Sequence, residues 1–174
     1  MKETIALIDK IIEEHEIITG KVHTLEQVAS DAEAIGELEK AKEVFMPGRF
    51  GQESRLQKLQ ELLETIAKGL QVHFNREETG LLIAFEKYGD KELASALHSL
   101  LCEHEDLRNR FAHLRKLVAE LAGGRLSRQV WEATAYDMRA YASHTRKLLE
   151  VHAETEEKLL RKLRSQLMGR GEEK

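Results

Sequence analysis

The sequence predicts an all-α protein, an up-down-up-down antiparallel four-helix bundle that forms one domain over residues 1–174. One third of the residues are charged and only one is proline, and Leu, Glu, Lys, Ala and Arg dominate the rest. This composition favours long helices over a sheet. A chain of 174 residues also has the size of a single domain with one continuous core.

Three short stretches divide the chain where glycine or proline would end a helix: Met46–Gly51, Lys87–Lys91 and Ala122–Arg125. The four long segments between them predict helices at residues 3–45, 52–87, 90–121 and 127–168. Because the connections are short, consecutive helices should run antiparallel.

The first two helices carry apolar residues spaced three and four apart, which marks the face that each turns inward. In the first helix these positions are Ile5, Ile8, Ile12, His15, Ile18, Val22 and Leu25. In the second they are Leu56, Leu59, Leu63, Ile66, Leu70, His73, Glu77 and, after a small shift, Leu81 and Ala84. Both faces therefore include groups that are costly to bury.

The last two helices repeat the pattern. The third has Leu93, Leu97, Leu100, His104, Leu107, Phe111, Leu114, Val118 and Leu121. The fourth has Trp131, Met138, Tyr141, Leu148, His152, Glu156, Leu159 and Leu163. Each helix thus turns one histidine inward, and two helices add a glutamate four residues later on the same side.

These six polar residues are predicted to meet in one layer. At a rise of about 1.5 Å per residue, all lie roughly 15 to 24 Å from the same end of the bundle. Such groups must be paired or bind a metal when buried. Carboxylate oxygen and imidazole nitrogen suit iron, manganese or zinc, and carboxylates from separate helices can bridge two ions. The expected metal ligands are His15, His73, Glu77, His104, His152 and Glu156.

The remaining histidines and the cysteine have simpler interpretations. His23, His98, His113 and His144 fall one position off the inward faces and are expected on the flanks or surface. Cys102 should face away from His104 as a small buried or boundary residue. Charged runs such as HAETEEKLLRKLR are expected to be mostly solvated helix surface.

Charge and hydropathy exclude other classes. The formal charge is −4 with no dense basic tract, so the footprint of a nucleic-acid-binding protein is missing. The longest apolar run, Leu81–Phe85, is far too short to span a membrane. The charged N-terminal stretch is unlike a secretory signal, and a lone cysteine fits a reducing compartment, so we expect a cytoplasmic protein.

Three stretches, HFNREETGLL, LLCEHEDLRNRF and LLEVHAETEEKLLRKL, resemble the ligand segments of the hemerythrin family, specifically its bacterial and regulatory HHE cation-binding branch. The likeness covers nearly the whole chain. It implies a non-haem di-iron centre in which Glu77 and Glu156 bridge the ions. One iron would be held further by His15 and His73, and the other by His104 and His152.

Two departures from the oxygen-carrying members stand out. Those members have a second histidine one turn after the first in the third helix, where this chain has Arg108, and HxxxxD in the fourth helix, where this chain has HxxxE. A guanidinium stays protonated and cannot act as a ligand. Arg108 should either lie across the mouth of the site or extend into solvent. The resemblance points away from reversible oxygen carriage and toward members that sense oxygen, iron or nitric oxide or help to repair iron centres.

Three hypotheses follow. The first is a di-iron protein, with manganese or zinc as substitutes, whose state responds to oxygen, nitric oxide, peroxide or iron supply. The second is a ferroxidase or peroxide-consuming enzyme on the same centre. The third is a metal-free interaction bundle, in which residues 27–45 of the long first helix would cover a protein partner or a second copy in a homodimer.

Overall fold

The structure, a computed structural model, describes the backbone of residues 1–40 and 52–172 and the side chains of residues 1–30 and 56–169. This part of the chain is entirely helical apart from short connections, which confirms the all-α prediction. The elements in chain order are α1 (Lys2–Lys40), α2 (Gln52–Arg76), the π-helical turn η1 (Glu77–Leu81), α3 (Leu82–Tyr88), α4 (Lys91–Leu101), α5 (Glu103–Ala122) and α6 (Arg128–Glu172).

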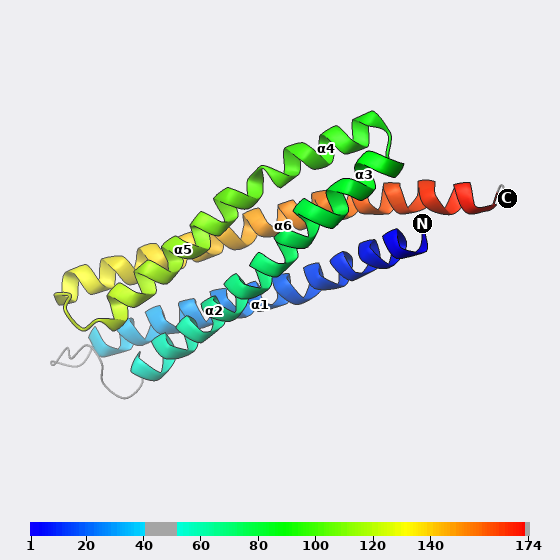
Figure 1. The fold of residues 1–174 in the computed structure, drawn as a ribbon. Helices are drawn as coiled ribbons and strands as arrows, with labels where there is room; N and C mark the ends of the chain where they lie inside the picture. Colours follow the sequence, from blue (N-terminus) through cyan, green and yellow to red (C-terminus); the bar gives the residue numbers. More distant parts are fainter. Residues whose placement is uncertain (41–51, 173–174) are drawn as a thin grey trace.

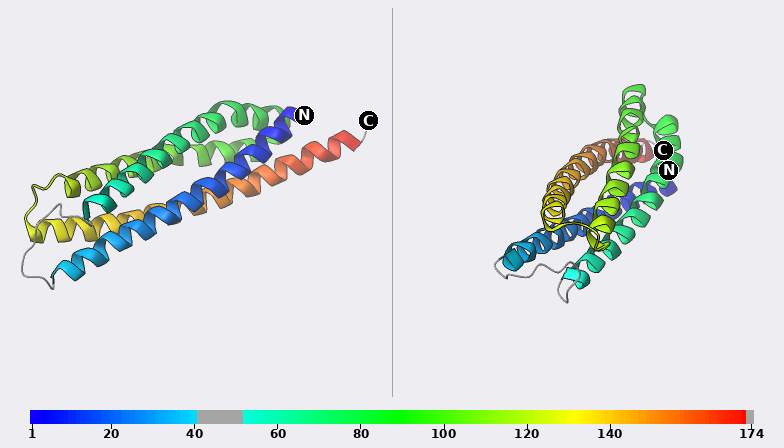
Figure 2. Two further views of the ribbon diagram at one scale, coloured as in Figure 1. Left: turned by 90° about the horizontal axis from the view of Figure 1, so that it is seen from below. Right: turned by 90° about the vertical axis from the view of Figure 1, so that its left-hand side faces the viewer.

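The long helices pack side by side as a bundle (Figure 1). The helix α1 packs against α2 and α6, and α5 packs against the same two helices. The N-terminus and C-terminus lie at one end of the molecule, and the connection from α5 to α6 lies at the other (Figures 1 and 2). One of the three predicted breaks, Met46–Gly51, lies outside the described residues, and so does the end of the first predicted helix at residues 41–45.

The second predicted helix is continuous but contains a π-helical turn at Glu77–Leu81. A π-turn adds a residue to the helical repeat, which accounts for the shift in apolar spacing after Glu77. Gly80 lies in this turn, and a Cβ atom there would stand 3.3 Å from Leu7 Cδ2. The glycine therefore allows η1 to approach α1 closely.

The third predicted helix is interrupted, which corrects the expectation of one helix over residues 90–121. The chain forms α4 and α5, separated by Cys102. Cys102 keeps helical angles, with φ −64° and ψ −21°, so the interruption is a local distortion. Apolar spacing runs unbroken through this point, and the sequence pattern therefore carries no sign of it.

The helix ends follow familiar local chemistry. The Asp90 carboxylate accepts a hydrogen bond of 2.8 Å from the backbone N–H of Leu93, which caps α4. Gly124 has φ +64°, a left-handed conformation that favours glycine, in the turn between α5 and α6. Within the described residues, no helix combines the length and apolar character needed to cross a membrane.

The apolar core consists of two clusters on either side of a polar layer. One cluster includes Ile8, Phe85 and Leu160, and the other includes Leu25, Phe111 and Trp131. The buried face of α6 differs from the prediction: Ala142, Leu149 and Leu160 are buried, whereas Tyr141, Leu148 and Leu159 are half-buried and pack on the edges of the clusters. In α1, Ile11 is buried instead of Ile12. Small residues such as Ala142 let α6 lie close to its neighbours, and its larger residues cover the seams.

Candidate metal centre

The polar layer between the two clusters contains the six predicted ligand residues. Among the described side chains, the buried polar or charged ones are these six and Thr145. His15 is the most exposed of the six, at 4%, and Glu77, His104 and Glu156 are fully buried. The elements that contribute are α1, α2, η1, α5 and α6. The prediction that the six side chains converge on one layer is therefore met by the structure.

Glu77 lies at the centre of this layer. Its Oε1 atom is 2.6 Å from Nε2 of His73 and 3.7 Å from Nε2 of His15. Its Oε2 atom is 3.2 Å from Nε2 of His104, and that nitrogen is 3.2 Å from Nε2 of His152. The π-turn begins at this residue, so the distortion lies where the carboxylate must reach histidines on both sides.

Glu156 lies on the α6 side of the layer. Its Oε2 atom is 3.2 Å from Nε2 of His15 and 3.9 Å from Nε2 of His152. The donor atoms therefore form two groups, each close enough together to hold an ion, and Glu77 belongs to both. One contains His15, His73, Glu77 and Glu156, and the other contains Glu77, His104 and His152.

All four histidines are oriented in the same sense, with Nε2 toward the central carboxylates and Nδ1 toward an outer glutamate. His73 Nδ1 is 3.0 Å from Glu14, His104 Nδ1 is 2.8 Å from Glu78, and His152 Nδ1 is 3.0 Å from Glu103. His15 Nδ1 is 3.8 Å from Glu157, beyond hydrogen-bond range. We call Glu14, Glu78, Glu103 and Glu157 the outer carboxylates.

The outer carboxylates connect the helices in a closed order. Glu14 of α1 lies next to the histidine of α2, and Glu78 of η1 lies next to the histidine of α5. Glu103 of α5 lies next to the histidine of α6, and Glu157 of α6 lies next to the histidine of α1. A carboxylate that accepts from Nδ1–H fixes the tautomer whose Nε2 lone pair is free to bind a metal. The outer carboxylates were not predicted from the sequence, and the run containing Glu157 was expected to be mostly solvated surface. The available signal was position, because each outer carboxylate directly precedes or follows a predicted ligand.

Arginines hold several outer carboxylates in turn. Arg76 pairs with Glu14, and Arg161 donates to Glu157 at 3.0 Å. Arg108 donates to Glu78 at 2.6 Å and is 32% exposed. Both predicted positions of Arg108, across the mouth of the site or extended into solvent, are therefore wrong, and the side chain lies one contact outside His104.

Phe74 packs directly against the imidazoles and was also missed. Its ring stacks on that of His104 with centroids 3.9 Å apart and an interplanar angle of 12°. It meets His152 edge-on at 6.1 Å, and the Arg108 guanidinium lies 5.2 Å from its centroid. The side chain is fully buried, so it excludes water from this side of the layer and restricts the rotation of His104.

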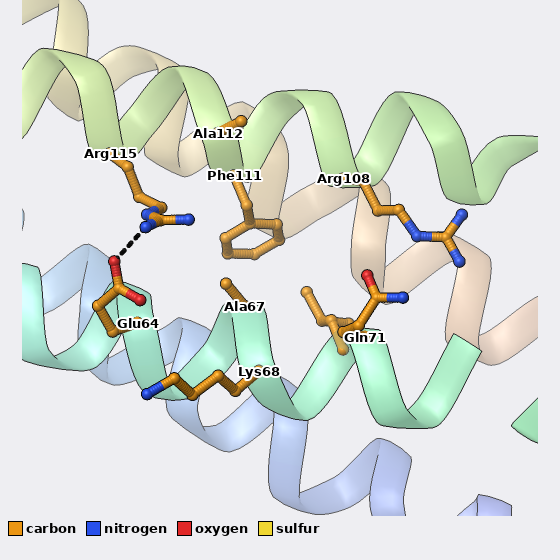
Figure 3. Close-up of a pocket in the computed structure, with 9 residues that line it drawn as sticks. Glu64, Ala67, Lys68, Gln71, Arg108, Phe111, Ala112 and Arg115 are labelled. Atoms are coloured by element: carbon orange, nitrogen blue, oxygen red, sulfur yellow. Dashed lines mark ion pairs between the residues drawn. The ribbon is translucent and has the colours of Figure 1, made fainter. Parts of the chain in front are cut away.

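A pocket of about 260 Å³ lies beyond Phe74 and Arg108, between α2 and α5. Figure 3 shows Phe111 in its centre and Arg108 at one end, with the guanidinium turned away from Phe111. Arg115 pairs with Glu64 at the other end. None of the six inward residues lines this pocket.

Electrostatics couple the buried groups when no metal is bound. Burial alone would lower the pKa of His15, but the carboxylates of Glu156 and Glu77 outweigh it and raise that pKa from 6.5 to about 9. Burial works to raise the pKa of Glu77, yet the close imidazoles of His104, His15 and His73 hold that pKa well below its ordinary value. Burial lowers the pKa of His152 despite its contact with Glu103.

The residues fit a metal ion on two observations. Neither ring nitrogen of His15 makes a hydrogen bond, and neither do the carboxylate oxygens of Glu77 and Glu156, although all are buried. Buried polar atoms without partners are costly, and coordination to a cation removes the cost. The donor set of imidazole nitrogen and carboxylate oxygen suits iron, manganese or zinc.

Residues predicted to lie outside the site do so. His23, His98, His113 and His144 are exposed. Cys102 is exposed as well, which corrects the expectation of a buried or boundary residue.

Comparison with known proteins agrees with this geometry. The family model described as the hemerythrin HHE cation-binding domain matches residues 6–163. Neither the comparison with curated proteins nor that with solved structures gave a match. The match spans nearly all of the chain and includes every residue of the polar layer, and the layer itself can hold a cation. The chain therefore belongs to the hemerythrin HHE cation-binding domain family.

Proposed function

We propose that this protein binds two non-haem iron ions and changes state in response to oxygen, nitric oxide, peroxide or iron supply. His15 and His73 would hold one ion and His104 and His152 the other, with Glu77 and Glu156 shared between them. The chain would act as one domain over residues 1–174, with its helices in up-down-up-down order.

The orientation of the four histidines carries this proposal. Every Nε2 faces at least one of the two central carboxylates, and every Nδ1 faces an outer carboxylate. A histidine buried for packing alone has no reason to repeat this arrangement on four helices. Glu77 also belongs to both donor groups, which supports a shared ligand and two ions. The sharing of Glu156 is supported less directly, by its 3.9 Å contact with His152.

Bound iron would supply a one-electron redox couple and coordination positions that six protein ligands leave unfilled. The protein supplies the surroundings. The outer carboxylates hold the imidazoles as acceptors of a metal ion, and Phe74 excludes water next to His104. Arg108 is engaged with Glu78 and offers no lone pair, so reversible oxygen carriage is not part of the proposal.

The alternatives receive less support. A ferroxidase or peroxide-consuming enzyme would use the same residues, and among the described side chains the one buried polar group beyond these six is the hydroxyl of Thr145. A metal-free bundle would leave the buried atoms of His15, Glu77 and Glu156 without hydrogen bonds. The proposed partner surface at residues 27–45 falls mostly outside the described side chains.

Metal analysis after anaerobic purification tests the assignment. We expect about two irons per chain in the natural protein and about one or fewer in Glu77→Ala, because this carboxylate serves both ions. His113→Ala is the matched control, since His113 is exposed and its ring contacts Tyr141 at 4.7 Å, away from the layer. Equal iron contents in the two variants would remove Glu77 from the ligand set, and an iron-free natural protein would support the metal-free bundle.

A further inference from the structure

A cleft between α1 and α6 opens onto the metal centre. Its volume is about 460 Å³, and His15 lies in its lining together with Glu16, Glu150, Glu154 and Glu157. No other residue of the polar layer lines it. His15 is therefore the described ligand residue that stands between this cleft and the buried carboxylates.

The lining of the cleft is acidic. It includes four glutamates, the two histidines His15 and His23, and neither lysine nor arginine, and His23 Nε2 lies 3.3 Å from Glu150. Arg146 and Arg161 pair with Glu150 and Glu157 from outside the lining. Glu16 and Glu154 make no ion pair with the described side chains and are exposed. The opening thus keeps a negative charge that attracts cations.

His15 is the least restrained of the four histidines. His73, His104 and His152 each hydrogen-bond an outer carboxylate at 2.8 to 3.0 Å through Nδ1. His15 Nδ1 stands 3.8 Å from Glu157, and neither of its ring nitrogens has a hydrogen-bond partner. Its side chain is only 4% exposed, yet it borders the cleft. An imidazole without a fixed Nδ1 contact can turn aside more easily than the other three.

We propose that the α1–α6 cleft is the route by which divalent metal ions reach the centre, with its glutamates concentrating the cation and His15 turning to admit it. This inference rests on the proposed metal-binding function and adds the path of loading. Glu16 and Glu154 collect the ion at the opening. His15 and Glu156 then receive it at the inner end, where Glu156 Oε2 lies 3.2 Å from His15 Nε2.

Gly20 offers a substitution that tests the path without altering a ligand. It lines the cleft, and a Cβ atom there would meet nothing within 4 Å, so Gly20→Lys adds a positive charge in open space. Gly69→Lys is the matched control, because Gly69 also lies within a helix with open space around it, on α2 and outside the cleft. Both changes also replace a helical glycine, so their effects on helix stability should be similar.

The measurement is the rate at which chelator-treated protein takes up Co²⁺, followed by visible absorption after rapid mixing. At low ionic strength we expect Gly20→Lys to slow uptake by about five- to tenfold, with the same final cobalt content, and Gly69→Lys to match the natural protein. The difference should shrink at high salt, because screening weakens the attraction. The double variant Glu16→Gln/Glu154→Gln provides a second test that adds no bulk, and it too should slow uptake.

The outcomes separate the two proposals. Equal uptake rates in the natural protein, Gly20→Lys and the double glutamine variant, at equal final cobalt content, would overturn the access route and leave the metal centre intact. Equal slowing by Gly20→Lys and Gly69→Lys would also overturn it. Failure of the natural protein to take up any Co²⁺ would overturn the metal-binding proposal and the route together.

Discussion

Two of the openings on the sides of the bundle differ in charge and in what they reach. The cleft between α1 and α6 is lined by acidic residues and ends at His15. The pocket between α2 and α5 is lined by Lys68, Arg108 and Arg115, with Glu64 as its one acidic residue (Figure 3). Phe74 and Arg108 separate this pocket from the histidines. One side of the centre therefore faces an acidic cleft, whereas the other is closed by an aromatic ring and an arginine.

The histidines on the two sides differ in the same way. His104, on α5, has its Nδ1 bonded to Glu78, its ring stacked on Phe74 and Arg108 behind both. His15, on α1, lacks an Nδ1 hydrogen bond. From this comparison we expect His104 to be fixed before metal binds and His15 to become fully fixed only when metal is bound.

Metal removal should have the largest effect and should act unevenly on the two sides. Without metal, the imidazole of His15 and the carboxylates of Glu77 and Glu156 remain buried with no hydrogen bonds and only neighbouring groups of the layer for ion pairing, at a cost of several kcal/mol. We expect the chelated protein to stay helical and to melt about 10 °C lower or more. Amide hydrogen exchange should rise first in α1 around His15, while α5 around His104 keeps its protection. A melting temperature unchanged by chelation would mean that the six residues already satisfy one another.

The pH dependence of the metal-free protein provides a control for this result. The raised pKa of His15, about 9 against 6.5 when unfolded, means that its contribution to stability is complete below pH 6.5 and is lost as pH rises toward 9. The raised pKa of His104 acts in the same direction. Denaturant unfolding should therefore show chelated protein losing up to about 3 kcal/mol of stability over this range. Metal-loaded protein should show no such loss, because its ligands are already neutral imidazoles.

The effect of each outer carboxylate on metal affinity should depend on how closely it contacts the Nδ1 atom of its histidine. Glu78→Ala removes the acceptor 2.8 Å from His104 Nδ1 and should weaken metal affinity by about 10- to 100-fold. Glu157→Ala removes a carboxylate 3.8 Å from His15 Nδ1 and should change affinity by less than about threefold. Glu78→Gln, which keeps an acceptor oxygen, should recover part of the loss. Competition with a metal-sensitive chelator measures the metal affinity of all three variants. Equal losses of affinity in the two alanine variants would contradict the expectation that His104 is fixed before metal binds and His15 is not.

Much of this centre could be predicted from the sequence because burial of a histidine or glutamate conflicts with an apolar helical repeat. His104 interrupts an otherwise unbroken series of apolar residues, which places it inside without any knowledge of the neighbouring helices. Counting residues from the breaks then brought all six groups to one level. The sequence also shows a shift in apolar spacing after Glu77, and only the backbone reveals that a π-helical turn accompanies it.

Other features could not be predicted from spacing on single helices. The outer carboxylates lie one position from the inward face, where a glutamate also suits solvent, and only the packing of a neighbouring helix gives them a histidine to contact. The buried face of α6 differs from the predicted one for a similar reason. Ala142 and Leu149 are buried in place of Tyr141 and Leu148, because the distance to α1 and α5 decides which residues fit the middle.

The smallest expected effect separates two arginines of the same pocket. Arg108 holds Glu78, which in turn holds His104, whereas Arg115 pairs with Glu64, which contacts no residue of the centre. Both arginines are partly exposed, so each ion pair contributes little to stability by itself, on the order of 1 kcal/mol or less.

Arg108→Leu should nevertheless weaken metal affinity by about two- to fivefold, because Glu78 loses the cation that helps to fix its position against His104. Arg115→Leu should leave the affinity unchanged while removing a similar charge from the same pocket. Competition titrations at low and high salt would measure both, and the Arg108 effect should diminish as salt screens the pair. If the two variants lost affinity equally, the general positive charge of the α2–α5 pocket would be the cause, and the specific contact from Arg108 through Glu78 to His104 would have no separate role.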